Sequence, residues 1–282
     1  MDYALNVKGV SKRYKEFYLD HVDLQVPKGS IMGFVGENGA GKSTTIKLIL
    51  NMVRRDSGNI EIFGMDAIEQ EQQVKQLIGV VFDESNFPDN MVAKDVNRMM
   101  KHIYANWDEA KFHEYLHKFS LPEKTAIKEY SRGMKMKLSI AVALSHHAKL
   151  LILDEPTSGL DPFIRDEILD IFLDFIQNEE HTILVSSHII SDLEKVADYI
   201  TFIHNGKILL SESKDQLLEN YGLLKCTHDD LQAIDPKIIV GMRKNRFGVE
   251  ALILKKEYRG KCPVDKASIE EIMLFHTKGE RV

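Results

Sequence analysis

The sequence predicts an α/β protein built on a parallel β-sheet, and three observations support that prediction. Short apolar runs with the character of buried strands alternate along the chain with segments of helical periodicity. One such run, at residues 31–35, leads through a glycine-rich loop into a helix predicted at residues 44–52, which is how a βα unit begins. Another run, at residues 150–153, ends in two acidic residues, as expected of a strand that delivers side chains to the carboxyl edge of a parallel sheet.

The composition is that of a globular protein and excludes several other classes. The 282 residues are 44% hydrophobic and 28% charged, which excludes a largely disordered or a collagen-like chain. No apolar stretch reaches the ~18 residues of a membrane-spanning helix, and the net charge of −6 gives no indication of nucleic-acid binding. The sequence starts without the features of a signal peptide. Cys226 and Cys262 are too few for a disulfide framework or a four-ligand zinc site, so we expect a reducing, cytoplasmic environment.

The remaining elements follow from local patterns. Strands are predicted at residues 4–7, 17–26, 60–63, 78–82 and 183–186, helices at residues 164–176 and 190–197, and a hairpin at Asn205-Gly206 between strands at 199–203 and 207–210. Residues from about 90 to 145 are helical in pattern and interrupt the alternation of strands and helices. Residues 213–282 are polar and mixed, which predicts a small C-terminal extension with a packing helix at residues 267–275.

A phosphate-binding motif occupies residues 36–43, where Gly-Glu-Asn-Gly-Ala-Gly-Lys-Ser fits G-x-x-x-x-G-K-[S/T] without a gap. Small residues let consecutive backbone N–H groups curl round a phosphate, and the helix that follows points its positive end at the same anion. Lys42 can reach the terminal phosphates of a nucleotide, and the hydroxyl of Ser43 can ligate Mg²⁺. Because a strand precedes and a helix follows, we interpret the segment as a nucleotide-binding loop and not as a glycine turn.

The acidic pair after residues 150–153 completes such a site. Asp154 stands at the carboxyl end of a predicted buried strand, where ligands bind in open α/β sheets, and would hold the Mg²⁺ shell. Glu155 follows directly and could polarise a water molecule. An exposed loop acid is the alternative for Glu155, and the neighbouring carboxylate and phosphate loop argue against it.

Three further segments identify the family. Tyr-Ser-Arg-Gly-Met at residues 130–134 resembles the signature motif of ATP-binding cassette (ABC) ATPases, usually Leu-Ser-Gly-Gly-Gln. Ser-Gly-Leu-Asp at residues 158–161 matches their D-loop, and Ser-Ser-His at residues 186–188 matches their switch histidine. Order and spacing agree over residues 4–220, so the chain resembles an ABC transporter nucleotide-binding subunit, closest to the ABC-2 export type.

The resemblance implies a division of the chain. The cassette of this family combines a parallel sheet core with an antiparallel β subdomain and a helical insert. We therefore expect an ATP-binding core with its β subdomain at residues 1–90 and 145–212, a helical signature subdomain at residues 91–144, and the extension at residues 213–282.

The resemblance also implies a site shared by two cassettes. Tyr14 would stack on adenine, Ser131 and Gly133 would contact the γ-phosphate held by a second cassette, and His188 would contact the γ-phosphate and the attacking water. Glu155 and His188 are thus the expected catalytic residues. The residues expected to contact ATP are Tyr14, Asn38, Gly39, Ala40, Gly41, Lys42, Ser43, Thr44, Ser131, Gly133, Met134 and Asp161, and those expected to bind Mg²⁺ are Ser43, Asp83 and Asp154.

Three positions depart from the family pattern. Asp83 stands where the family has a glutamine that ligates Mg²⁺ and couples to the membrane partner, and a carboxylate is a shorter, charged ligand. Glu84, the next residue, is a less suitable substitute for that glutamine. Arg132 replaces the first glycine of the signature motif and Met134 replaces its glutamine, which leaves Ser131 and Gly133 in place.

By resemblance, the chain would be the ATP-hydrolysing motor of a membrane exporter. It would work as a dimer of cassettes bound at the inner face of the cell membrane to a transmembrane permease in a separate chain. An importer motor, or an ABC ATPase of translation or DNA repair, is the alternative. The gap of ~90 residues between phosphate loop and signature is too short for the coiled coil of repair members, and translation factors usually carry two cassettes.

Overall fold

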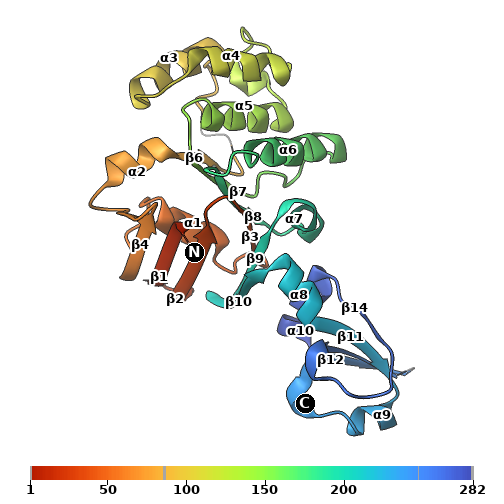
Figure 1. Cartoon of the computed structure of the whole chain (residues 1–282). Coiled ribbons are helices and arrows are strands. Elements are labelled where there is room, and N and C mark those ends of the chain that lie inside the picture. Colours follow the sequence, from red (N-terminus) through yellow and green to blue (C-terminus); the bar gives the residue numbers. More distant parts are fainter. Residues whose placement is uncertain (1, 85–86, 247, 281–282) are drawn as a thin grey trace.

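The computed structural model describes residues 2–84, 87–246 and 248–280 and confirms an α/β architecture around a six-stranded sheet (Figure 1). The strand order is β10-β9-β3-β8-β7-β6, with β9 to β6 parallel and β10 antiparallel at the edge. The strands are β3 (Ile31–Val35), β6 (Ile78–Val81), β7 (Leu150–Asp154), β8 (Thr182–Ser187), β9 (Tyr199–His204) and β10 (Lys207–Ser213).

The central strands are buried on both faces, which explains why each contains a short apolar run without alternating polar residues. Every residue of β3, β7 and β8 is buried. Alternate residues of these strands pack into two different hydrophobic cores. Met32 and Ile152 pack against α1 (Lys42–Ile49) and an antiparallel sheet, whereas Ile31 and Leu151 pack against other helices. Those helices are α5 (Arg132–Leu144), α6 (Pro162–Phe175) and α7 (Ile190–Val196).

The antiparallel sheet has the order β2-β1-β4-β5 and lies beside the central sheet (Figure 1). Its strands are β1 (Tyr3–Arg13), β2 (Tyr18–Pro27), β4 (Ser57–Ile62) and β5 (Met65–Asp66), and α2 (Glu71–Leu77) leads from it to β6. In β2 the buried Val22, Leu24 and Val26 alternate with the exposed His21, Asp23 and Gln25, as the sequence pattern predicts. One face is therefore buried against α1 and the other is solvated.

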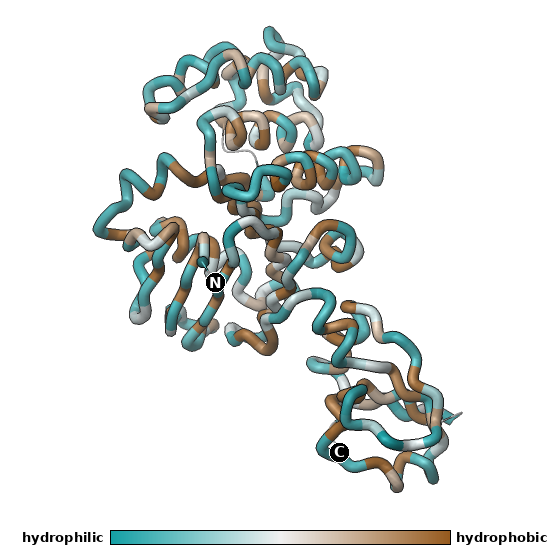
Figure 2. Tube along the Cα trace, viewed as in Figure 1, coloured by the Kyte–Doolittle hydropathy of each residue, from teal (hydrophilic) through white to brown (hydrophobic). Residues whose placement is uncertain are grey.

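A helical layer is inserted between β6 and β7, within the range predicted for the insert. It contains α3 (Ala93–Ile103), α4 (Glu109–Lys118), a short 3₁₀ turn (Ile127–Glu129) and α5. Ser131 caps α5 and Asp108 caps α4, each by accepting a backbone N–H three residues further on. Figure 2 shows that the outer part of this layer is largely hydrophilic, whereas hydrophobic segments gather around the central strands.

The C-terminal residues form a second antiparallel sheet, which the sequence analysis did not predict. It has the order β12-β13-β11-β14 and lies at the opposite end of the molecule from α3 and α4 (Figure 1). Its elements are α8 (Lys214–Asn220), β11 (Tyr221–Cys226), α9 (His228–Gln232), β12 (Ile239–Asn245), β13 (Gly248–Leu254), β14 (Val264–Lys266) and α10 (Ile269–Lys278), with 3₁₀ turns at Pro236–Ile238 and Lys255–Glu257.

The C-terminal module also contacts the central unit. The backbone N–H of Ile269 donates to Glu194 of α7 at 3.0 Å, and Lys278 at the end of α10 pairs with Glu37 at 3.1 Å. Among the described residues, no helix has both the length and the apolar character needed to cross a membrane.

Candidate active site

The phosphate-binding loop joins β3 to α1 and has the backbone that its glycines predict. Gly39 and Gly41 adopt φ angles of 81° and 117°, which other residues rarely adopt. A Cβ on Gly36 would lie 2.5 Å from the carbonyl oxygen of Ile203, so this position requires glycine. The loop borders a hollow of about 420 Å³, lined by Phe17, Glu37, Asn38, Gly39, Gly41, Lys42, Ser43, Thr44, Asp83 and Glu155.

Lys42 is buried at the first position of α1, with 5% of its side chain exposed. Its ammonium donates to the carbonyl of Gly36 at 2.7 Å and lies 3.1 Å from Oε1 of Glu155. A buried ammonium requires such partners. The loop thus holds its cation between a backbone carbonyl and a carboxylate.

The acidic pair is positioned by the neighbouring strand β8. Ser186 is fully buried, and its hydroxyl donates to Asp154 Oδ1 at 2.6 Å while accepting the backbone N–H of Glu155 at 3.1 Å. Glu155 has a φ of 53°, a conformation that costs energy in a residue with a side chain and that is concentrated at functional sites. The strained turn directs its carboxylate back toward the phosphate loop.

His188, just after β8, holds the other oxygen of that carboxylate. Its Nδ1 lies 2.7 Å from Glu155 Oε2, and its backbone N–H donates to the same oxygen at 3.2 Å. With Lys42 on Oε1, the Glu155 carboxylate lies between the phosphate loop and the predicted switch histidine. The structure therefore brings together Lys42, Glu155 and His188 from three separate segments of the chain.

The donor set fits Mg²⁺ bound together with a nucleotide. Ser43 and Asp83 line the hollow, and Asp154 lies next to Glu155 at the end of β7, so hydroxyl and carboxylate oxygens are available. In the described part of the chain, no group of three or more His, Cys, Asp or Glu residues could hold a metal ion. Mg²⁺ usually keeps several waters and binds one or two carboxylates together with substrate phosphates, so phosphate oxygens and water would supply its other ligands.

The signature and D-loop residues lie elsewhere in the same chain. Ser131 caps α5 and Asp161 caps α6, accepting the backbone N–H groups of Phe163 and Ile164 at 3.1 Å each. The described lining of the hollow does not include Ser131, Gly133, Met134 or Asp161. This placement suits residues that would act on a second cassette, which stays a proposal.

Phe17 brings an aromatic ring to the lining of the hollow. Tyr14 is 43% exposed and does not belong to the described lining, although its backbone N–H bonds to the Phe17 carbonyl at 2.8 Å in the same turn. Phe17 is not predicted from the sequence, because the family's usual spacing points to Tyr14. Adenine stacking on Tyr14 stays a prediction, and Phe17 is a second candidate for the same contact.

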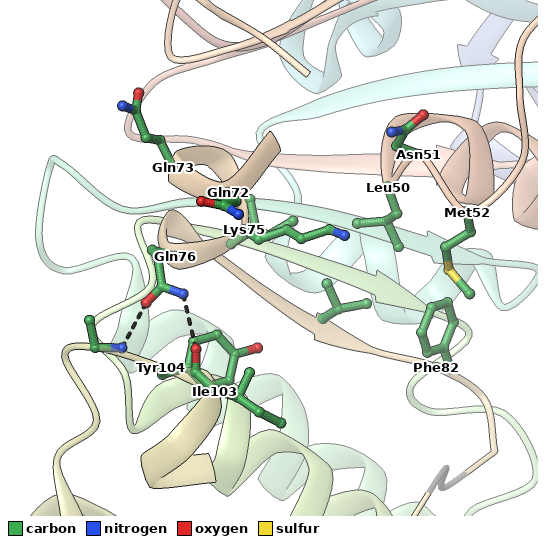
Figure 3. Close-up of a pocket in the computed structure, with 13 residues that line it drawn as sticks. Leu50, Asn51, Met52, Gln72, Gln73, Lys75, Gln76, Phe82, Ile103 and Tyr104 are labelled. Carbon is green, nitrogen blue, oxygen red and sulfur yellow. Dashed lines mark hydrogen bonds between the residues drawn. The ribbon is translucent and has the colours of Figure 1, made fainter. Parts of the chain in front are cut away.

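A larger hollow of about 820 Å³ opens between β6, α2 and the end of α3 (Figure 3). Gln76 crosses its edge: its amide donates to the Ile103 carbonyl at 3.2 Å and accepts the backbone N–H of Ala105 at 2.9 Å. Met52 and Ile103 border it with 59% and 52% of their surfaces exposed. Exposed apolar side chains round a hollow are typical of a surface that binds another protein.

Comparisons with known proteins agree with the geometry. The family model described as "ABC transporter" matches residues 19–158. The lantibiotic transport ATP-binding protein SrtF of Streptococcus pyogenes is 37% identical over 214 residues, which cover 75% of this chain and 91% of that protein. The bacitracin transport ATP-binding protein BcrA of Bacillus licheniformis is 37% identical over 193 residues, which cover 68% of this chain and 63%, less than two thirds, of that protein.

A solved structure gives the same result for the fold. The chain superimposes with a TM-score of 0.67 and 27% sequence identity on a structure titled "Structure of ATP binding subunit of ABC transporter", over 76% of this chain and 91% of that one.

Proposed function

The chain belongs to the ATP-binding cassette (ABC) transporter family and is one of its ATP-hydrolysing subunits, and we propose that it powers the export of a substrate through a separate membrane protein. The names of the relatives support this proposal, because they concern the transport of a lantibiotic and of bacitracin. The observation that carries the hydrolytic part is the Glu155 carboxylate held between Lys42 and His188.

In this proposal the phosphate loop binds ATP and Lys42 changes partner. The backbone N–H groups of residues 38–44 and the start of α1 hold the phosphates. Lys42 leaves the Glu155 carboxylate for the terminal phosphates, where its charge has a stronger partner. Ser43, Asp83 and Asp154 would hold Mg²⁺, which neutralises charge on the phosphates when it is bound.

The departure of Lys42 prepares Glu155 for proton transfer. Oε2 of Glu155 stays fixed by the two N–H contacts from His188, at 2.7 and 3.2 Å. Oε1, released by Lys42, becomes free to accept a proton from the attacking water. His188 therefore orients the Glu155 carboxylate, and the departure of Lys42 leaves its Oε1 free.

We propose that two cassettes share each ATP. Ser131, Gly133, Met134 and Asp161 do not line the nucleotide hollow of their own chain, and they would complete the site of a second copy or of a related cassette. In this proposal the membrane protein docks at the hollow of Figure 3, whose exposed apolar side chains support such a contact, and the motor would then lie at the inner face of the cell membrane.

The test is hydrolysis and binding in Glu155→Gln. The amide keeps the shape of the side chain and cannot act as a base, so Mg²⁺-dependent ATP hydrolysis should fall by ~10²–10⁴-fold while ATP binding by calorimetry is kept. Glu180→Gln is the matched control, because Glu180 is an exposed acid paired with Lys149 and should leave both quantities unchanged. Normal turnover in Glu155→Gln would exclude Glu155 as the base.

A further inference from the structure

Two of the positions at which the chain departs from the family motifs are bonded to each other. Asp83 follows β6, and Arg132 is the first residue of α5, 49 residues further on. The guanidinium of Arg132 donates from Nη2 to Oδ1 of Asp83. The pair joins the edge of the nucleotide hollow to the helical insert.

Arg132 also contacts the segment after Glu155. A Cβ on Gly159 would lie 2.8 Å from Nη1 of Arg132, so the guanidinium lies directly against the D-loop backbone. Asp83 itself lines the hollow together with Lys42 and Ser43. One side chain thus connects the signature segment, the D-loop and a carboxylate of the nucleotide site.

The charge balance of the site shows what this contact does. Three acids of the site each have a partner. Asp154 has Ser186, Glu155 has Lys42 and His188, and Asp83 has Arg132. Asp83 and Arg132 are 45% and 50% exposed, so their attraction contributes little to folding stability. Its main effect is on the local charge and on which oxygen of Asp83 is free.

Resting on the proposed function, we propose that Arg132 is a positioning residue for Asp83. Arg132 compensates the charge of Asp83 while the metal position is empty and holds its Oδ1 toward α5. Asp83 must exchange Arg132 for Mg²⁺ before it can serve as a metal ligand at that oxygen. The metal position and the first turn of α5 therefore compete for one carboxylate.

The exchange has a consequence for the second cassette. Release of Arg132 frees the first turn of α5, which carries Ser131 and Gly133, and removes a contact from the D-loop at Gly159. These are the segments proposed to contact the partner's ATP. Occupation of the metal position in one site is thereby linked to the placement of groups for the other.

The test measures the affinity of the full chain for a fluorescent ATP analogue, once with Mg²⁺ and once with EDTA. The quantity compared between wild type and variants is the dissociation constant in EDTA divided by the dissociation constant in Mg²⁺. In Arg132→Gln the charge of Asp83 is uncompensated without metal and its oxygen is free with metal. The ratio should therefore rise by up to about fivefold, the factor that corresponds to one exposed charge pair. In Asp83→Asn the further change Arg132→Gln should leave the ratio unaltered.

Two controls separate this role from a structural one. Arg132→Lys keeps a cation within reach of Oδ1 and should return the ratio to the wild-type value. Lys118→Gln removes another exposed cation of the helical insert, paired with Asp174 of α6 at 3.1 Å, and should also give the wild-type ratio. An unchanged ratio in Arg132→Gln, or an equal rise with and without Asp83, would overturn the proposal.

The outcome is distinguishable from a failure of the proposed function. If ATP does not bind, or Glu155→Gln hydrolyses ATP normally, the function itself is wrong. If ATP binds and hydrolysis requires Glu155, but Arg132 and Asp83 act independently on the ratio, then only the role of Arg132 is wrong.

Discussion

Lys42 shows at the scale of one residue how the site is prepared for its ligand. The ammonium is buried and bound to the Gly36 carbonyl and the Glu155 carboxylate, at 2.7 and 3.1 Å. Both partners belong to the site itself, so the charge is kept where a phosphate would need it.

Lys42→Ala should weaken ATP binding by about 10- to 100-fold, because a charge-assisted bond to phosphate contributes ~1.5–3 kcal/mol. Calorimetric titration with Mg²⁺-ATP measures the change. Lys47→Ala is the control, because Lys47 lies exposed on the same helix α1. This variant should bind ATP as tightly as the wild type. Equal affinities in Lys42→Ala and wild type would contradict the assignment of the loop.

The sequence predicts some of these residues and not others, for physical reasons. Lys42 and Ser43 belong to one contiguous motif, and Glu155 follows one apolar run, so local order is enough to identify them. Phe17 also lines the hollow, because the turn at residues 14–17 brings its ring there, and a spacing rule that points to Tyr14 does not reveal this second candidate. The roles of Ser186 and Arg132 depend on contacts 31 to 49 residues away, which one sequence does not reveal.

Within the elements, His146 connects the end of α5 to the central sheet. It is 1% exposed, its Nε2 lies 2.9 Å from the Ile78 carbonyl, and its ring stacks on Tyr104 at 3.8 Å. Burial lowers the pKa of His146 below its usual 6.5, and the electrostatic effects of the neighbouring His147 and Lys111 act in the same direction. The contacts with the Ile78 and Val142 carbonyls oppose this lowering without cancelling it.

Stability should therefore fall as the pH falls below about 6.5. The unfolded chain binds a proton on His146 near that pH, whereas the folded chain does so only at lower pH, so the contribution of the neutral ring is complete above 6.5 and is lost below it. We expect the melting temperature to drop between pH 7.5 and 5.5, and to drop less in His146→Gln. His147→Gln, in which the exposed neighbour is replaced, should largely keep the wild-type dependence.

The sequence predicts the strands of the central parallel sheet better than those of the C-terminal sheet. The parallel strands are predicted because burial on both faces leaves uninterrupted apolar runs, as in β7. The C-terminal sheet is missed because its apolar runs are short and interrupted: in β11 only Leu223 and Leu224 stand between a glycine and Lys225, and in β13 Glu250 breaks the run. The helix predicted at residues 44–52 begins earlier, at Lys42 directly after the left-handed Gly41, and ends earlier, at Ile49, shortly before Asn51 with its positive φ of 54°.

At the scale of the whole molecule, an exposed aromatic ring lies on the surface just after the D-loop. Phe163 is 84% exposed at the start of α6, next to Asp161, which is expected at the interface between cassettes. An apolar ring in this position gains free energy when a second cassette covers it. The exposed ring and the split ATP site therefore point to the same face.

Phe163→Ser should raise the dissociation constant of the ATP-bound dimer at least tenfold, because each copy loses part of the ~1.5–3 kcal/mol of a buried aromatic ring. The dimer is measured by light scattering with Glu155→Gln present to prevent turnover. Leu173→Ser is the control, as Leu173 is 39% exposed on the same helix and more distant from the D-loop. Equal dimerisation in both variants would remove Phe163 from the interface.

The bond between Asp83 and Arg132 also has an evolutionary consequence. A mutation that turns the usual glutamine into an acid places an unbalanced charge beside the nucleotide, and a cation at the first signature glycine restores the balance. The two positions should therefore change together in descent, glutamine with glycine in one lineage and acid with base in another. An alignment of many relatives should show this covariation, with an acid at position 83 rare wherever position 132 is uncharged.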